Sequence, residues 1–428
     1  MTKELKKQKA LIYHKAVDAF DTNGKTGTLI TKECNTTEEL SLAYSPGVAF
    51  PCLEIQEDNK LAYTYTNKGN LVAVISDGTA VLGLGDIGHM ASKPVMEGKC
   101  VLFKKFANVD AIDLQVSQKS VEEIVTTIHA ISDSFGGINL EDIAAPKCFE
   151  VEKQLKEKCN IPVFHDDQHG TAVITTAGLI NSLKMTGKNV NEIKVVVIGS
   201  GAAGIACAKM YKNLGVENIL MFDSKGLIES SRTDLAAYKQ EFMVESEIRT
   251  LEEAMDGADM VLGLSKADVL TKEMVASMNS NPVIFACANP DPEILPSDAK
   301  EVRDDVIVGT GRSDFANQVN NVLGFPAIFR GALDVQASKI TEGMKLAAAN
   351  ALAKLAEEEV TTEVKRAHNR DDMCFGVDYV IPSPFDRRVL VYVASEVART
   401  AVEEGVAGIE DFNYDEYKRF LQELSTKH

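Results

Sequence analysis

Four residues whose side chains could bind a metal ion or move a proton stand within five positions of the segment VFHDDQHGTAV: His165, Asp166, Asp167 and His169. Apolar residues flank the four on both sides, which predicts a partly buried position. A second acidic pair, Glu141 and Asp142, lies in the equally apolar segment GGINLEDIAAP. One acidic pair alone is typical of a helix cap or a solvated face. Two pairs among hydrophobic residues favour a site for Mg²⁺ or Mn²⁺, because both ions prefer carboxylate ligands.

The two histidines support an alternative interpretation. His165 and His169 are four positions apart, the spacing of a zinc-binding pair on a helix. Such a site would indicate a metal-dependent hydrolase that works without any dinucleotide. The order H-D-D-Q-H lacks the catalytic glutamate of HExxH sites, and Gly170 follows at once, so this alternative is the weaker one.

A glycine-rich segment further along the chain predicts a dinucleotide site. Gly199, Gly201 and Gly204, with Ala202 and Ala203 between them, follow the strand-like stretch EIKVVVI and precede a helical pattern. Glycines there permit a tight turn and let backbone N–H groups approach a pyrophosphate at the helix N-terminus. An acidic residue about 20 positions on completes this motif, and Asp223 occupies that place.

The choice between NAD and NADP stays open. Asp223 would accept hydrogen bonds from the ribose 2′-hydroxyl of NAD. Lys225, and Arg232 after it, could instead neutralise the 2′-phosphate of NADP.

A divalent cation next to a nicotinamide indicates one chemistry in particular. An α-hydroxy acid chelates such a cation through its hydroxyl and carboxylate, which lowers the pKa of the hydroxyl. After hydride transfer the new carbonyl is an electron sink, so a β-carboxylate can leave as CO₂. The residues therefore favour metal-assisted oxidation of an α-hydroxy acid, followed by loss of CO₂ if the substrate has a β-carboxylate.

The order of elements that must position these residues predicts an α/β fold. Residues 1–160 mix strands and helices and form a smaller N-terminal substrate domain. Residues 161–390 alternate Val- and Ile-rich strands with helices, which is typical of a Rossmann-like, doubly wound parallel sheet. Residues 391–428 form a helical segment that is expected to pack back on the first domain.

Composition excludes several classes of partner. The formal net charge of −18 over 428 residues disfavours binding to nucleic acid or to anionic membranes. The eight cysteines form no CxxC pair, which indicates a reducing compartment. The N-terminal segment has neither a secretory nor a mitochondrial pattern, and no apolar stretch is long enough to span a membrane. We expect a cytoplasmic protein.

The chain also resembles the short, bacterial-type malic enzymes over nearly its whole length. The ordered motifs that carry this resemblance are LAYSPGVAFPCLEI, VISDGTAVLGLGDIG, KPVMEGKCVLFKKFANVDAID, INLEDIAAP, PVFHDDQHGTAV, VVVIGSGAAGIACA, FACANPDPEI and NQVNNVLGFPAIFRGALD. The resemblance implies oxidative decarboxylation of L-malate to pyruvate and CO₂ with NAD or NADP, and a homodimer or larger oligomer. Decarboxylation of oxaloacetate is a further expected activity.

The resemblance also implies a role for individual residues. Tyr44 would be the general acid and Lys99 the general base, held by Asp166. The metal ligands would be Glu141, Asp142 and Asp167. Asn289 and Asn321 would bind substrate, and Asn289 also the cofactor. A lysine is a base at neutral pH only when burial and a nearby cation depress its pKa, so we expect a depressed pKa at Lys99.

One position departs from the larger, animal-type members of the family. These carry an arginine that binds a substrate carboxylate where Thr79 stands in this chain. The cationic partner of that carboxylate is therefore unassigned, with Arg312 and Lys105 as candidates. The allosteric segments of the longer members also have no counterpart.

Two further functions stay open beside these. One is a malolactic-type decarboxylase that retains NAD and causes no net redox change. The other is a catalytically silent NAD sensor, which would not need Tyr44, Lys99 and the three carboxylates.

Overall fold

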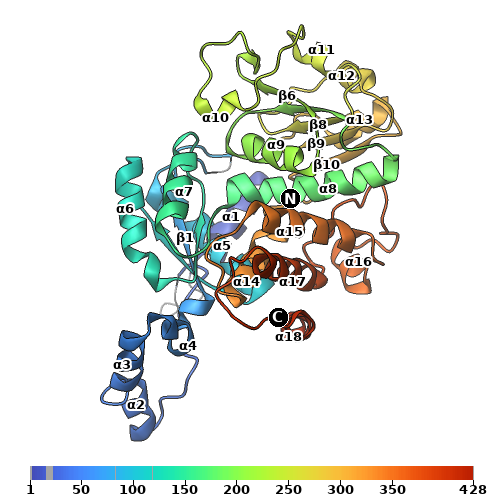
Figure 1. The fold of residues 1–428 in the computed structure, drawn as a ribbon. Coiled ribbons are helices and arrows are strands. Elements are labelled where there is room, and N and C mark those ends of the chain that lie inside the picture. Colours follow the sequence, from blue (N-terminus) through green and yellow to red (C-terminus); the bar gives the residue numbers. More distant parts are fainter. Residues whose placement is uncertain (1, 16–22, 82, 118, 428) are drawn as a thin grey trace.

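The computed structural model describes residues 2–15, 23–81, 83–117 and 119–427, which form two β-sheets with helices around and between them (Figure 1). The first sheet is parallel, with strand order β2-β1-β3-β4. Its strands are β1 (Leu71–Ser76), β2 (Asp110–Gln115), β3 (Gly137–Leu140) and β4 (Val163–His165). Strands β1 and β3 are buried throughout, as expected of a parallel sheet covered on both faces.

Alternate residues of β1 point to two different cores. Ala73 and Ile75 pack with α6 (Val121–Ile131) and α7 (Lys147–Lys158). Val72 and Val74 pack with α5 (His89–Ala107) and with α14 (Phe325–Asp334). Helix α14 follows the second sheet in the sequence. One face of the first sheet is therefore covered in part by residues from the C-terminal part of the chain.

The second sheet has the order β10-β9-β8-β5-β6-β7, parallel except for β7 at its edge. Its strands are β5 (Lys194–Ile198), β6 (Asn218–Asp223), β7 (Gly226–Leu227), β8 (Met260–Gly263), β9 (Val283–Ala286) and β10 (Ile307–Thr310). Helices α8 (Asp166–Thr186) and α9 (Ala202–Leu214) cover one face. The other face packs against α11 (Leu251–Met255), α12 (Lys272–Ser277) and α13 (Pro296–Val302).

The C-terminal helices pack back on the body, but against helices of residues 161–390 rather than on the first domain, where they were expected. Helix α17 (Arg388–Glu403) lies against α14 and α15 (Glu342–Ala356), and α18 (Tyr414–Lys427) lies against α17. The α/β fold class with a Rossmann-like sheet is therefore confirmed. The domain boundaries at residues 160 and 390 stay a prediction.

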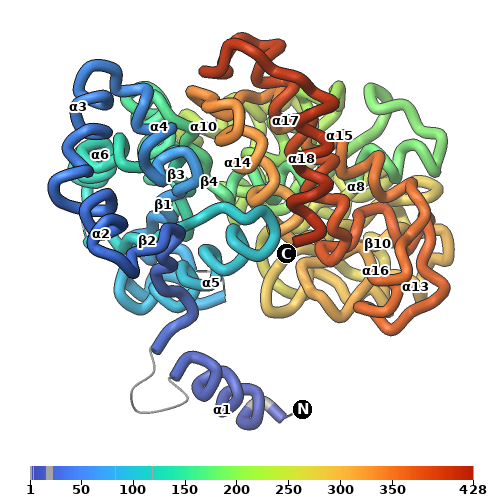
Figure 2. The backbone as a smooth tube through the Cα atoms, turned by 90° about the horizontal axis from the view of Figure 1, so that it is seen from below, coloured from blue at the N-terminus to red at the C-terminus, as the bar shows by residue number. Residues whose placement is uncertain are grey.

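An arm of short helices projects from the body next to the first sheet (Figures 1 and 2). It consists of α2 (Thr37–Ala43), α3 (Ala49–Glu57) and α4 (Ala62–Tyr65), and the described residues 37–65 include no buried one. Large apolar side chains on it are open to solvent, with Leu42 68% and Phe50 73% exposed. The remaining helices are α1 (Lys3–Tyr13), α10 (Ala237–Gln240) and α16 (Thr362–His368).

No helix among the described residues is long and apolar enough to cross a lipid bilayer.

Candidate active site and metal centre

The two acidic pairs meet because the strands that precede them are neighbours. Strand β3 ends at Leu140, directly before Glu141 and Asp142, and β4 ends at His165, directly before Asp166. Leu140 pairs with His165 in the parallel register, so both acidic pairs leave the same edge of the sheet. Ligands bind outside the carboxyl ends of the strands in open α/β sheets, and this edge is such a place.

Glu141, Asp142 and Asp167 form one cluster of possible metal ligands. One carboxylate oxygen from each lies within 4.8 Å of the others. The backbone of Asp142 has φ 54°, a left-handed conformation, and its N–H donates a hydrogen bond of 2.7 Å to Asp167 Oδ2. Asp142 Oδ2 is buried without a hydrogen-bond partner. A hard divalent cation fits this set, because the ligands are all oxygens and one of them is unsatisfied.

The carboxylates of the cluster repel one another in a buried place. Burial, together with its neighbours Asp167 and Asp166, raises the pKa of Glu141 to about 8. Burial and the charge of Glu141 raise the pKa of Asp142 to about 7. Burial and the charge of Asp142 do the same for Asp167, whose pKa is about 7. A divalent cation would relieve this repulsion.

Lys99 stands between two of the acidic residues. Its Nζ lies 2.5 Å from Asp166 Oδ2, 2.7 Å from Glu141 Oε1 and 4.2 Å from the centre of the Phe325 ring. Burial lowers the pKa of Lys99, but the charges of Asp166 and Glu141 outweigh burial, so the net shift is upward. The depressed pKa that we expect requires a cation beside Lys99 as well as burial, so it stays a prediction.

Asp166 is held by a residue from far along the chain. Asn321 Nδ2 donates to Asp166 Oδ2 at 3.1 Å, and Asn321 Oδ1 accepts a hydrogen bond of 3.2 Å from Thr171. This contact needs a glycine at position 170, where a Cβ would lie 2.1 Å from Asp166 Oδ1. In the sequence Gly170 served only as an argument against a helical zinc pair.

The two histidines are not part of the cluster. The ring nitrogens of His165 are buried without a hydrogen-bond partner, and burial lowers its pKa to about 4. His169 Nε2 lies 2.8 Å from Glu152 Oε1, while its Nδ1 lies 3.0 Å from Lys345 Nζ. Burial lowers the pKa of His169 to about 4 as well. Within the described residues the histidines thus serve packing and hydrogen bonding, which disfavours the zinc alternative.

The glycine segment forms the turn between β5 and α9. Gly199 has φ 115°, and a Cβ at Gly204 would lie 1.9 Å from the carbonyl oxygen of Gly199. A Cβ at Gly201 would meet nothing within 4 Å, so the backbone is open there. Ala202 and Ala203 begin α9. This is the geometry that lets a pyrophosphate rest on the helix N-terminus.

Asp223 ends β6 next to this turn, and two basic residues already contact it. Arg232 reaches its two carboxylate oxygens at 2.8 and 3.1 Å, and Lys239 lies at 2.8 Å. Partial burial opposes ionisation, yet these partners lower the pKa of Asp223 to about 2. Lys225 does not offset the charge of Asp223 as expected, since its Nζ pairs with Asp234 at 2.6 Å. The sequence pattern missed Lys239 altogether.

Tyr44 does not lie with the cluster in a single chain. It follows α2 on the projecting arm, and its side chain is 73% exposed (Figure 1). Lys99, by contrast, has a side chain that is only 11% exposed. One copy of the chain therefore leaves the predicted acid and the predicted base apart.

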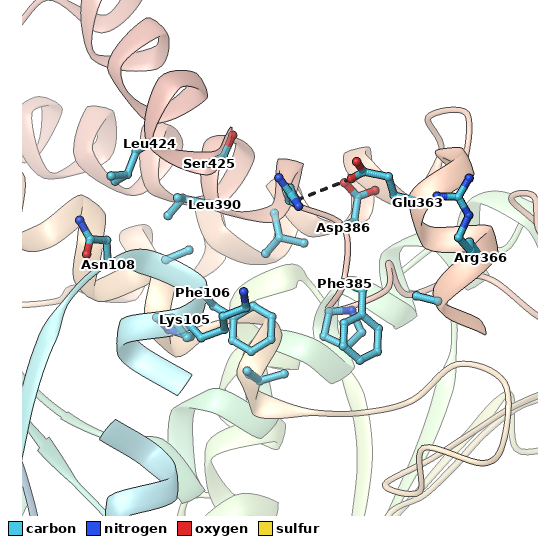
Figure 3. Close-up of a pocket in the computed structure, with 17 residues that line it drawn as sticks. Lys105, Phe106, Asn108, Glu363, Arg366, Phe385, Asp386, Leu390, Leu424 and Ser425 are labelled. Atoms are coloured by element: carbon cyan, nitrogen blue, oxygen red, sulfur yellow. Dashed lines mark ion pairs between the residues drawn. The ribbon is translucent and has the colours of Figure 1, made fainter. Parts of the chain in front are cut away.

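The remaining candidates lie elsewhere. Asn289 follows β9 at the carboxyl edge of the second sheet and is exposed. Arg312 contacts Asp314 at 2.7 Å and Asp291 at 3.5 Å. Lys105 lines a separate cavity of about 450 Å³ among α5, α14, α16, α17 and α18 (Figure 3). Neither Arg312 nor Lys105, the two candidate partners of the substrate carboxylate, thus lies in the carboxylate cluster.

The fold and the site together define a two-sheet dinucleotide-binding protein with a carboxylate cluster and a lysine at the edge of its first sheet. Two family models match the chain: "Malic enzyme, N-terminal domain" at residues 23–120 and 113–156, and "Malic enzyme, NAD binding domain" at residues 168–366. The chain belongs to the malic enzyme family.

Curated relatives match this chain over nearly its whole length. The chain is 54% identical over 406 residues to the NADP-dependent malic enzyme of Halomonas elongata, covering 94% of this chain and 95% of that protein. It is 51% identical over 411 residues to the bifunctional malic/malolactic enzyme of Bacillus subtilis, again covering 94% and 95%. Other relatives are longer, and the chain spans only 54–56% of their length.

The fold matches solved structures of the same family. The malic enzyme of Pyrococcus horikoshii superimposes with a TM-score of 0.88 at 40% identity, covering 98% of this chain and 95% of that one.

The cluster geometry predicts that Asp167→Ala loses divalent-cation binding, because two carboxylates remain where three converge. We expect the Mn²⁺ affinity, measured by calorimetry, to fall at least tenfold, while dinucleotide affinity stays unchanged. Asp304→Ala, which removes an exposed carboxylate, is the matched control. Unchanged Mn²⁺ binding by Asp167→Ala would overturn the assignment.

The raised pKa values predict a pH dependence of cation binding. A protonated carboxyl cannot hold the cation, so Mn²⁺ affinity should rise steadily from pH 6 to pH 8, the range that contains the pKa values of about 7 and about 8. Titrations at pH 6, 7 and 8 measure this. Affinity that is constant over the range contradicts the clustered carboxylates.

Proposed function

We propose that this chain catalyses the oxidative decarboxylation of L-malate to pyruvate and CO₂, with NAD or NADP as hydride acceptor. The observation that carries the proposal is Lys99, 2.7 Å from Glu141 at the edge of the cation cluster and 2.5 Å from Asp166. This contact supports a proton-transferring role for Lys99 beside the residues that would hold the cation. The names of the relatives, NADP- or NAD-dependent malic enzymes, support the same reaction.

Glu141, Asp142 and Asp167 would hold the divalent cation, Mg²⁺ or Mn²⁺. When bound, the cation supplies a Lewis acid that polarises the oxygen on C2 of the substrate. It also offsets the charge of Glu141, which lowers the pKa of Lys99 toward the range of a base.

The proton transfers then fall to residues of this chain. Lys99 takes the hydroxyl proton of malate while a hydride leaves C2 for the nicotinamide. The C3–C4 bond then breaks and CO₂ departs. The electron pair of that bond remains on the product, which is the enolate of pyruvate. Tyr44 donates the proton that C3 needs. Oxaloacetate would undergo the same decarboxylation without the hydride step.

Two asparagines would orient the reactants. Asn321 contacts Asp166, so its amide lies beside Lys99 and within reach of a substrate in the cluster. Asn289 leaves the carboxyl edge of the second sheet, the edge to which the glycine turn also belongs. We assign substrate binding to both, and a cofactor contact to Asn289.

Tyr44 would come from a second copy of the chain. The arm that carries it exposes Leu42, Phe50 and Leu53, which is more apolar surface than a short projecting segment keeps in water. A homodimer or larger homo-oligomer covers such a surface and brings one protomer's Tyr44 to its partner's Lys99. We propose that the protein is cytoplasmic. Its eight free cysteines support this, because thiols stay reduced in that compartment.

Complementation between subunits tests this arrangement. Lys99→Ala and Tyr44→Phe homo-oligomers should each lose about 10²–10⁴-fold in turnover, the usual contribution of a general acid or base. Mixed oligomers should regain activity, because one of their sites then receives an intact lysine and an intact tyrosine. The readout is NAD(P)H formation after co-refolding or co-expression with two purification tags. Verified hetero-oligomers without any recovery would place both residues in one chain's site.

Coenzyme choice depends on the basic residues around Asp223. A 2′-phosphate near that carboxylate needs Arg232 and Lys239 to offset its charge, and both already contact it. Arg232→Ala should therefore lower kcat/KM for NADP about tenfold or more and leave NAD nearly unchanged. Lys225→Ala is the matched comparison and should have the smaller effect. Equal losses with both coenzymes would mean that Arg232 never meets the phosphate.

A second candidate function is the malolactic reaction. It is favoured by the similarity to the bifunctional malic/malolactic enzyme. In this reaction the pyruvate formed is reduced again before the dinucleotide leaves. Lactate that accumulates without NADH, assayed alongside the absorbance at the nicotinamide band, would support this candidate against the first.

A further inference from the structure

The structure assigns the missing cationic partner of the substrate to Lys147: we infer that its ammonium group binds the carboxylate that pyruvate retains. This inference rests on the function proposed above. It concerns the position where Thr79 stands instead of the arginine of larger family members.

Lys147 is placed beside Thr79 by a shared carboxylate. Asp77 Oδ2 accepts a hydrogen bond from Lys147 Nζ, and Asp77 Oδ1 accepts one of 2.6 Å from Thr79 Oγ1. The ammonium group therefore lies one carboxylate away from the Thr79 hydroxyl. A lysine from the start of α7 thus brings a positive charge to the loop after β1.

The same contacts tie Lys147 to the cation cluster. Ala80 N–H donates to the carbonyl oxygen of Asp142 at 3.0 Å, and Ala144 N–H donates to Thr79 Oγ1 at 3.0 Å. The loop after β1, which contains Thr79 and Ala80, is thus bonded to the segment that runs from the metal ligand Asp142 to Lys147 at the start of α7. Asp142 and Lys147 therefore lie on one short segment that leaves the carboxyl edge of the first sheet.

Lys147 is also free enough to accept a ligand. Its side chain is 21% exposed, whereas Asp77, its partner, is 2% exposed. An ammonium group has three N–H donors, and the bond to Asp77 uses one. Lys99, the other cation nearby, already faces two carboxylates.

The chemistry selects which carboxylate Lys147 binds. The carboxylate that leaves as CO₂ loses its charge, so a cation beside it would stabilise the ground state more than the transition state. The carboxylate that remains in pyruvate keeps its charge throughout. An ammonium group beside that second carboxylate therefore strengthens substrate binding and does not slow decarboxylation. At the leaving carboxylate it would slow the reaction.

The test compares four variants of the intact chain. Lys147→Met removes the charge, and Lys147→Arg keeps it. Asp77→Asn/Lys147→Met also removes the carboxylate that would otherwise be stranded, which guards against misfolding. Lys104→Met is the matched control, since Lys104 makes a 2.9 Å ion pair with Asp110 on the surface.

We expect the KM for L-malate to rise about 10- to 100-fold in Lys147→Met and in the double variant, with kcat changed far less. Affinity for pyruvate, measured by calorimetry with Mn²⁺ and NAD(P)H present, should fall equally. Lys147→Arg should stay within several-fold of the wild type, and Mn²⁺ and dinucleotide affinities should not change.

An unchanged malate KM in the double variant overturns the inference. So does a loss of malate affinity without a loss of pyruvate affinity, because Lys147 would then bind the leaving carboxylate. Equal failure of the arginine and methionine variants together with weaker Mn²⁺ binding indicates a structural role instead. A wild-type chain that does not oxidise malate refutes the proposed function itself and is seen before any variant is made.

Discussion

Four carboxylates and one lysine share the buried edge of the first sheet, and the rest of the site depends on how their charges balance. Glu141, Asp142, Asp166 and Asp167 together carry up to four negative charges, against the single positive charge of Lys99. Buried charges of one sign are costly unless they are paired. In the protein alone, the pKa values of three of the four carboxyls are raised, which reduces the buried negative charge near neutral pH. A divalent cation between Glu141, Asp142 and Asp167 would offset more of this negative charge than Lys99 does alone.

The fold concentrates these charges because parallel strands end together. Strands β3 and β4 deliver both acidic pairs to one edge, and α8 begins directly at Asp166. Its first turn is a favourable place for two aspartates, since the helix N-terminus carries a partial positive charge. The same helix then packs against α9 of the dinucleotide sheet. One continuous helix thus links the cation cluster to the domain that would hold the nicotinamide.

The sequence alone predicted the features that depend on local sequence patterns. Strand periodicity predicted the α/β fold, and glycine spacing predicted the turn between β5 and α9. The apolar flanks of the two acidic pairs favoured a metal site, and the family resemblance implied that Glu141, Asp142 and Asp167 are its ligands. The pairings that the sequence could not predict join residues distant along the chain, such as Lys147 with Asp77 and Asn321 with Asp166. No periodicity records such contacts, because they follow from strand order and crossover geometry. The contacts of Lys99 with Asp166 and Glu141 are of the same kind, since the two carboxylates come from other elements of the fold.

The central claim is that Glu141, Asp142 and Asp167 hold the cation that malate decarboxylation requires. Anomalous diffraction at the manganese edge, from crystals grown with Mn²⁺, tests it most directly. We expect one strong peak between the three carboxylates, roughly 2.1 Å from an oxygen of each, close to the distance that small hard cations adopt. A peak at His165 and His169, or none near Glu141 and Asp142, would contradict the account.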